Sequence, residues 1–213
     1  MRTRGARGGF TLVELLVVMA ILATLVGLGV ATIPAMMRRA DKTAVEGFLS
    51  MLDAQIENYR NSEQGAYPPS TLAEFPGVGL LSNFENSGIE ALVACLASRA
   101  YRPSFDLLER QKKMRLENYD GDRTAVQLTD FGDKDLFEIV DPWGTPLVYI
   151  HSSDYGRAEE ICRVTGEAGV LKAKPWMNPQ LKRAYMPDRY QLISAGPDRE
   201  FNTEDDVTNF ERN

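Results

Sequence analysis

The densest group of potential metal ligands in this sequence lies near its C-terminal end. Six side chains supply oxygen atoms within nine residues: Asp198, Glu200, Asn202, Glu204, Asp205 and Asp206. Calcium binds six to eight oxygens from carboxylates, amides and carbonyls, often in one loop. The spacing is not that of an EF-hand, because the central glycine and the terminal glutamate are missing. The residues alone favour a solvated acidic loop, with a calcium loop as the alternative.

Other reactive residue types favour structural roles. Asp120 and Asp122 lie in a turn at 118–122 and could contact a cation, but Asp-Gly turns are common and an ordinary turn is favoured. Adjacent Glu159 and Glu160 would point apart on a strand, so shared acid–base work is not expected. His151, the single histidine, has no evident nucleophile partner. The sequence contains no phosphate loop, HExxH or nucleophile elbow, so we expect no enzyme.

Composition narrows the class of protein further. A 44% apolar and 25% charged chain of 213 residues is not disordered, and its net charge of −6 argues against a nucleic-acid partner. Its two cysteines, Cys95 and Cys162, exclude a small disulfide scaffold and a four-thiolate metal site. A disulfide between them stays open, because Cys95 on an apolar helix face is equally well explained as a small buried residue.

The N-terminal segment would determine where in the cell the C-terminal acidic loop lies. Arg2, Arg4 and Arg7 precede 23 uncharged residues from Leu15 to Met37. As a helix this run is about 35 Å long, against a bilayer core of about 30 Å, with the arginines on the cytoplasmic side. A secretory signal peptide is the alternative, although its apolar run would be shorter. Glu14 favours a retained helix, because a carboxylate at mid-membrane costs roughly 2.5–3.5 kcal/mol and needs a functional reason.

The run Gly9-Phe10-Thr11-Leu12-Val13-Glu14 resembles the processing site of type IV prepilins and type II secretion pseudopilins. The resemblance implies that prepilin peptidase cuts after Gly9 and N-methylates Phe10. It also implies that Glu14 is retained for assembly. In a filament, Glu14 of one subunit would pair with the Phe10 amine of its neighbour, since two buried charges offset each other.

The following elements are predicted from periodicity and turn residues. Apolar residues at helical spacing form one face that packs on a sheet: Val45, Phe48, Leu49, Leu52, Ile56 and Tyr59. Pro34 should kink this long helix, and Gly65-Ala66-Tyr67-Pro68-Pro69 should end it. Further predictions are helices at Ile89–Ala100 and Phe105–Glu117, a hairpin of Leu136–Val140 with Pro146–His151, a strand at Ile161–Thr165, an exposed loop at 172–187 and a final strand at Tyr190–Ser194.

The turn Asp141-Pro142-Trp143-Gly144 before a strand also resembles the major, G-type pseudopilin. That resemblance implies a calcium-binding C-terminal loop and reverses the preference for a merely solvated one. The implied calcium ligands are Asp198, Asp205, Asp206, the backbone carbonyls of Leu192 and Ala195, and Asn202. Arg199 and Asn202 depart from the family, which often has glycine at both positions, so the turn there is open.

We therefore expect an α+β, pilin-like fold: a long N-terminal helix, half transmembrane and half amphipathic, on a small antiparallel β-sheet. Extra helices and an insertion at 156–187 are expected beside it, and the resemblance does not extend securely over 76–135. The expected parts are a cleaved leader (1–9), a transmembrane polymerisation helix (10–37) and an exported periplasmic domain (38–213). The implied function is that of a structural pseudopilus subunit in type II secretion, anchored in the bacterial inner membrane.

The implied partners are further copies of the chain, minor pseudopilins, prepilin peptidase, the inner-membrane assembly platform and membrane lipid. Two alternatives remain. One is a type IV pilin or minor pilin for adhesion, motility or DNA uptake. The other is a membrane-anchored, calcium-dependent binding module that never polymerises.

Overall fold

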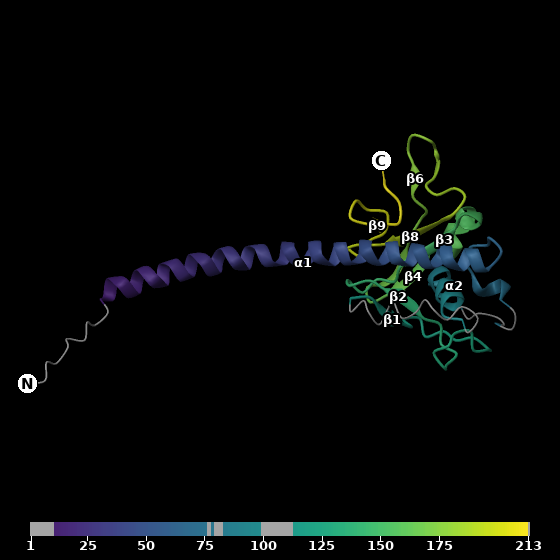
Figure 1. Cartoon of the computed structure of the whole chain (residues 1–213), viewed down its shortest axis with the longest axis horizontal. Helices are drawn as coiled ribbons and strands as arrows, with labels where there is room; N and C mark the ends of the chain where they lie inside the picture. Colours follow the sequence, from purple (N-terminus) through teal and green to yellow (C-terminus); the bar gives the residue numbers. More distant parts are fainter. Residues whose placement is uncertain (1–10, 76–77, 79–82, 99–112, 213) are drawn as a thin grey trace, which may run out of the picture. The chain divides into compact units, whose positions relative to one another are not determined.

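The structure is a computed structural model that describes residues 11–75, 78, 83–98 and 113–212, without the side chains of 27–32 and Glu74. The chain divides into two compact units, Met1–Ala40 and Asp41–Asn213. One helix, α1 (Leu12–Ser62), runs from the first unit into the second and continues through Pro34 (Figure 1). Over the described residues, no helix combines the length and apolar character needed to span a membrane.

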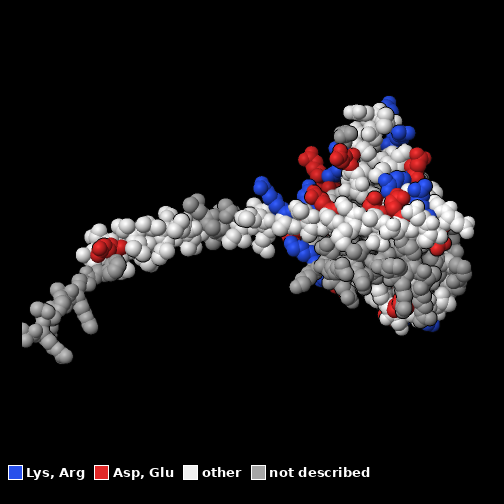
Figure 2. Space-filling model, in the orientation of Figure 1, with Lys and Arg blue, Asp and Glu red and all other residues white. Residues whose placement is uncertain are grey.

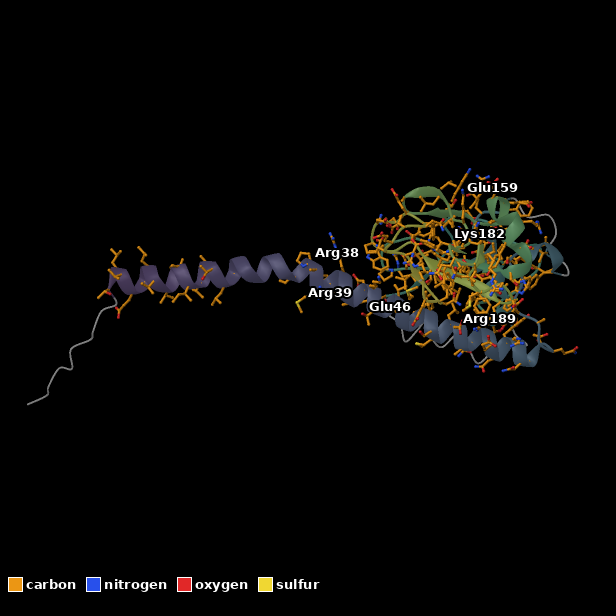
Figure 3. All side chains as sticks on the ribbon, turned by 90° about the horizontal axis from the view of Figure 1, so that it is seen from above. Arg38, Arg39, Glu46, Glu159, Lys182 and Arg189 are labelled. Atoms are coloured by element: carbon orange, nitrogen blue, oxygen red, sulfur yellow. The ribbon has the colours of Figure 1, made fainter. Side chains whose placement is uncertain are left out.

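The N-terminal half of α1 exposes its apolar side chains. Large ones at both of its ends are more than half exposed, for example Leu12 at 80% and Met36 at 68%. Glu14 is the single acid between residues 11 and 40, and this part of the helix is almost uniformly uncharged (Figure 2). Arg38 and Arg39 follow the uncharged stretch (Figure 3). A large exposed apolar surface typically marks a site of contact with another protein or with lipid.

The C-terminal half of α1 packs into the core of the second unit, as the periodicity predicted. Buried residues on it are 0–4% exposed: Val45, Phe48, Leu49, Leu52 and Ile56. Tyr59 lies partly buried against the same cluster. Burying each such side chain contributes roughly 1.5–3 kcal/mol. The helix ends as expected, because Gln64 (φ 54°) and Gly65 (φ 95°) turn left-handed and the Gly65 N–H donates to the Arg60 carbonyl at 2.8 Å.

The remaining helical elements are short. They are η1 (Leu72–Glu74), α2 (Ser87–Leu96), η2 (Ser152–Arg157) and α4 (Ala158–Ile161). All ten residues of α2 are buried. Leu92 and Val93 belong to the cluster on α1, whereas Ala91 and Ala94 belong to a separate cluster with Leu72. Helix α2 therefore forms the centre of the second unit.

Helix α2 also lies directly against a strand. A Cβ atom built on Gly88 would come within 1.9 Å of the Tyr149 carbonyl oxygen. The Tyr149 hydroxyl donates to the Pro68 carbonyl at 2.5 Å. The strand thus contacts both the start of α2 and the segment that follows α1.

The described strands form four small antiparallel sheets. Their pairs are β1 (Arg115–Glu117) with β2 (Glu138–Val140), β3 (Val148–His151) with β8 (Tyr190–Ser194) and β9 (Val207–Thr208), β4 (Arg163–Gly166) with β5 (Gly169–Lys172), and β6 (Met177–Asn178) with β7 (Arg183–Ala184). Strand β8 is central in its sheet and all five of its residues are buried. The α+β class is confirmed, but the expectation of one sheet is wrong.

Several predicted elements differ in detail. The turn at Asp141–Thr145 forms, with the Asp141 N–H donating to the Thr145 carbonyl at 2.9 Å. Strands β2 and β3 then diverge, because each pairs with another partner and a single Val140–Pro146 bridge joins them. The predicted helix at 105–117 falls outside the described residues up to 112, and its end at 115–117 is strand β1. Strand β8 has the predicted bounds, but β9 follows it, and short strands β6 and β7 interrupt the predicted loop.

Candidate functional site

The first described residues place Glu14 in a capping box. Thr11 precedes α1, and both its backbone N–H and its hydroxyl donate to Glu14 Oε2 at 2.9 Å. The Glu14 N–H donates in return to the Thr11 hydroxyl at 3.2 Å. This reciprocal pattern satisfies backbone donors that have no partner at a helix start. Gly9 and Phe10, the predicted processing residues, lie outside the described part of the chain.

In the C-terminal loop, other groups of the protein donate hydrogen bonds to the carboxylate of Asp206. Its Oδ2 accepts from Trp176 Nε1 and from the Asn202 N–H, both at 2.9 Å. Asp206 is 2% exposed, and its burial raises its pKa although these hydrogen bonds oppose the shift. The guanidinium of Arg212 donates to the Asp206 carbonyl at 2.7 Å. Asp206 is therefore a structural anchor of the loop.

The other predicted calcium ligands fall into two groups: those that hydrogen-bond to distant parts of the second unit, and those that contact each other within the loop. Asn202 exchanges two hydrogen bonds with the backbone of Lys174, and the Leu192 carbonyl accepts from the Asn209 N–H at 3.3 Å. Asp198 and Asp205 stay adjacent, with the Asp198 N–H donating to Asp205 Oδ2 at 3.2 Å.

Ala195 is fully buried at the end of β8. Within the described residues, Asp198, Asp205 and Asp206 do not bring three ligand oxygens within 4.8 Å of one another. The donor chemistry of Asp198 and Asp205 fits a hard cation, and the predicted ligand set stays a prediction.

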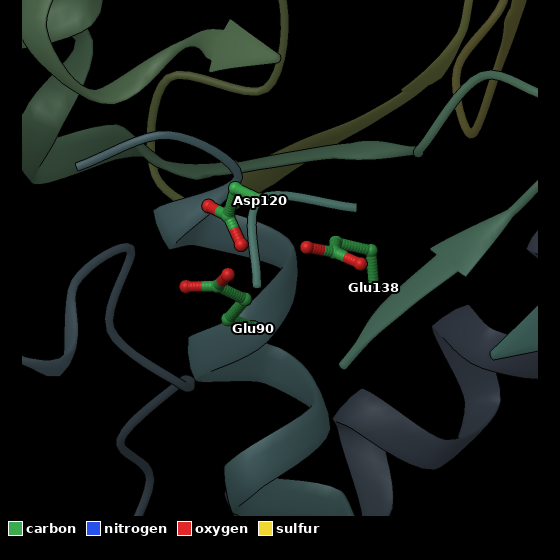
Figure 4. Close-up of side chains that lie close together, drawn as sticks. All are labelled: Glu90, Asp120 and Glu138. Atoms are coloured by element: carbon green, nitrogen blue, oxygen red, sulfur yellow. The ribbon is translucent and has the colours of Figure 1, made fainter. Parts of the chain in front are cut away.

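A different set of carboxylates does converge. Glu90, Asp120 and Glu138 each place one oxygen within 4.8 Å of the others, and Figure 4 shows the three side chains facing a common point. They come from the first turn of α2, the turn after β1 and the first residue of β2. Burial raises the pKa of Glu138 to about 8, that of Glu90 well above its ordinary range, and that of neighbouring Asp122 to about 7.

Comparison with known proteins adds to this geometry. Residues 4–30 match the family model of the prokaryotic N-terminal methylation motif. The chain is also 24% identical over 210 residues to the type II secretion system core protein G of Escherichia coli strain K12, across 99% of this chain and 95% of that protein. No solved structure matches the chain.

The resemblance to the prepilins and pseudopilins is confirmed. Two residues of the C-terminal loop, Arg199 and Asn202, stand at positions where we expected glycine from that resemblance. Arg199 and Asn202 have φ angles of 62° and 67°. That left-handed region is the one that glycine adopts most easily, so the backbone keeps a glycine-type turn without glycine.

The remaining sequence candidates have structural surroundings. Cys95 and Cys162, both within the described residues, are free and buried, and burial raises the pKa of each thiol to about 12. No disulfide joins them in this structure. The imidazole of His151 accepts from the Ser153 N–H at 3.2 Å and so caps η2.

Two features of these sites were missed from the sequence, although signals for both existed. Thr11 and Glu14 have the Thr-x-x-Glu spacing of a capping box. Glu90 is the one charge within the apolar run Ile89–Ala97, and a helix of that composition is expected to be buried. Its convergence with Asp120 and Glu138 depends on contacts across 30 and 48 positions, which no local pattern contains.

Proposed function

We propose that this chain is a pseudopilin, a structural subunit that polymerises through the N-terminal half of α1 and drives protein export in a type II secretion system. The observation that carries the proposal is the methylation motif at residues 4–30 together with similarity to core protein G over 99% of the chain. The exposed apolar surface of α1 supports it, because such a surface suits packing against lipid before assembly and against other subunits afterwards.

Processing and location follow from the same proposal. Prepilin peptidase removes the basic leader 1–9 by cutting after Gly9 and methylates Phe10. Residues 10–37 then anchor the subunit in the inner membrane, and residues 38–213 form the periplasmic domain. The subunit leaves the lipid by joining other copies at the assembly platform, where minor pseudopilins share the filament.

Glu14 sets the register between neighbouring subunits in this proposal. In the single chain its carboxylate is held by Thr11 in the capping box. In the filament the same carboxylate pairs with the methylated amine of Phe10 in a neighbour. A carboxylate and an amine are each costly in a low dielectric, and pairing offsets the cost.

The test is crosslinking of cysteines introduced on the exposed N-terminal half of α1 in cells. Glu14→Ala should insert into the membrane normally and lose most of the subunit ladder. Thr11→Ala removes the cap but keeps the carboxylate, so its ladder should remain. Glu46→Ala, at an exposed acid in the second unit, is the matched control. A normal ladder from Glu14→Ala contradicts the role of Glu14, and no ladder from the wild type favours a non-polymerising module.

We also propose that calcium binds the C-terminal loop through Asp198 and Asp205, an adjacent pair of carboxylates that is less buried than Asp206. A ligand that binds only the folded state raises its stability. Calcium should therefore raise the melting temperature of the wild-type protein relative to chelator, and Asp205→Asn should reduce the rise.

A further inference from the structure

We propose that Glu90, Asp120 and Glu138 form an internal calcium site at the junction of α2 with the β1–β2 sheet, separate from the C-terminal loop. The two sites share no residue and no secondary structure element. This inference stands independently of the proposed secretion function, because it depends only on the second unit.

The first argument is that buried carboxylate oxygens in the group have no partner. Glu90 is 2% exposed, and its Oε1 receives no hydrogen bond. Both side-chain oxygens of Asp120 and Oδ1 of Asp122 are likewise buried and unpartnered. Leaving a buried acceptor unsatisfied costs about 1–3 kcal/mol, and more when it is charged. The carboxylates of Glu90 and Asp120 face one another and Glu138, so one bound cation would satisfy several of the unpartnered oxygens (Figure 4).

The second argument is the absence of a counter-charge. Among the described residues, no Lys, Arg or His forms an ion pair with Glu90, Asp120, Asp122 or Glu138. Nearby cations serve other acids: Arg163 pairs with Glu85 at 3.0 Å, and Arg123 pairs with Asp135 at 2.6 Å. Buried charges are normally paired or bound to a metal. Four neighbouring acids that have no basic partner among the described residues therefore favour a metal.

The third argument is that the protein orients Glu138 and leaves room for a ligand bond. Its Oε1 accepts from Asn86 Nδ2 at 3.0 Å, and its Oε2 accepts from the Tyr119 N–H at 3.2 Å. Each oxygen retains a free lone pair. Second-shell bonds of this kind hold a metal ligand in place.

The geometry and donor type select the metal. Calcium–oxygen bonds of 2.3–2.6 Å place ligands on opposite sides of the ion about 5 Å apart. The 4.8 Å limit on the separations among the three oxygens fits that sphere. The set contains carboxylates and no nitrogen or sulfur ligand, which disfavours zinc. Bidentate binding by Glu90 and Asp120 with one oxygen of Glu138 would supply about five oxygens, and water would complete the six to eight that calcium takes.

The consequence for the fold is a calcium-dependent clamp. Glu90 belongs to the helix at the centre of the second unit, and Glu138 to the strand that pairs with β1. The bound ion would replace mutual repulsion between these acids with attraction to one shared charge. Calcium should thus strengthen the packing of α2 on the β1–β2 sheet.

The experiment uses the full chain in detergent, with calcium chloride as the probe. The background variant Asp198→Asn/Asp205→Asn removes the loop pair, and calorimetry then counts the ions that remain. We expect one calcium ion to bind to this background. Adding Asp120→Asn or Glu138→Gln should weaken that affinity at least tenfold.

Stability measurements distinguish a metal site from ordinary structural roles. In chelator, Asp120→Asn should be at least as stable as the background, because it removes repulsion, whereas in calcium it should be less stable. Loss of stability to the same extent in both conditions overturns the proposal. So does a background variant that binds no calcium, an unchanged affinity in both added variants, or a larger response to magnesium than to calcium. If Asp198→Asn/Asp205→Asn by itself abolishes all calcium binding, the loop proposal stands and the internal site is rejected.

Discussion

The contact between Gly88 and β3 allows one substitution to be worked through in detail. In Gly88→Ala, the new methyl group would lie 1.9 Å from the Tyr149 carbonyl oxygen, which belongs to backbone and cannot rotate away. Ordinary van der Waals contact requires well over 3 Å, so α2 or β3 must move by more than 1 Å. Both elements are buried on several sides, and α2 has no exposed residue that would allow it to slide outward.

The expected cost follows from known overpacking. Inserting one methyl group into a packed core typically costs 1–3 kcal/mol. The severity of this contact places Gly88→Ala at about 3 kcal/mol of unfolding free energy. For a unit of this size, each 1 kcal/mol lowers the melting temperature by about 2–4 °C, so the drop should be about 6–12 °C. The higher helix propensity of alanine recovers less than about 1 kcal/mol of it.

Trp fluorescence during urea unfolding of the full chain in detergent measures this effect selectively. Both tryptophans, Trp143 and Trp176, lie in the second unit. Gly47→Ala is the matched control, since nothing lies within 4 Å of its new Cβ in α1. It should raise stability by roughly 0.5–1 kcal/mol. If Gly88→Ala proves as stable as wild type, α2 does not approach β3 as closely as described.

The other predictions concern buried polar groups of the second unit. Asp141 accepts from the N–H groups of Trp143 and Thr145 at 3.0 Å and from the Ser194 hydroxyl at 2.7 Å, so Asp141→Ala should cost about 3 kcal/mol at about 1 kcal/mol per bond. Asp141→Asn keeps one acceptor and should cost clearly less in the same urea titration; equal costs would mean that packing, and not hydrogen bonding, dominates. Burial lowers the pKa of His151 in the folded state, and the charge of Asp154 opposes the shift. As the pH falls through about 6.5, the unfolded chain therefore binds a proton more readily than the folded chain, and the folded state loses stability. His151→Gln should therefore lose less stability than wild type between pH 7.5 and 5.5, and an identical loss would refute this assignment.

The parts of the fold that the sequence predicts are those with a local periodic signal. The spacing of Val45, Phe48 and Leu52 identifies the buried face of α1 because a helix repeats every 3.6 residues. The run Tyr190–Ser194 matches β8 because a β-branched and apolar segment between turns suits a buried central strand. Neither result needed knowledge of a distant partner.

The parts that were wrong or missed depend on such partners. Arg115–Glu117 looks helical in isolation, but pairing with Glu138–Val140 makes it a strand. The surroundings of Asp206 were missed as well, because the indole of Trp176, 30 positions earlier in the sequence, donates to its carboxylate. Tertiary contacts of this kind override local propensity, because packing contributes more than the fraction of a kcal/mol that separates the propensities.

The two concealed thiols make the chain convenient for chemistry on its surface. Maleimides and copper-catalysed air oxidation act on the thiolate form, which is scarce when a thiol has a pKa of about 12 and is shielded from solvent. Cysteines placed on the bare N-terminal half of α1 can therefore be labelled or joined without first replacing Cys95 and Cys162. Reaction of a reagent with Cys95 or Cys162 would then report that the second unit has unfolded, at least locally.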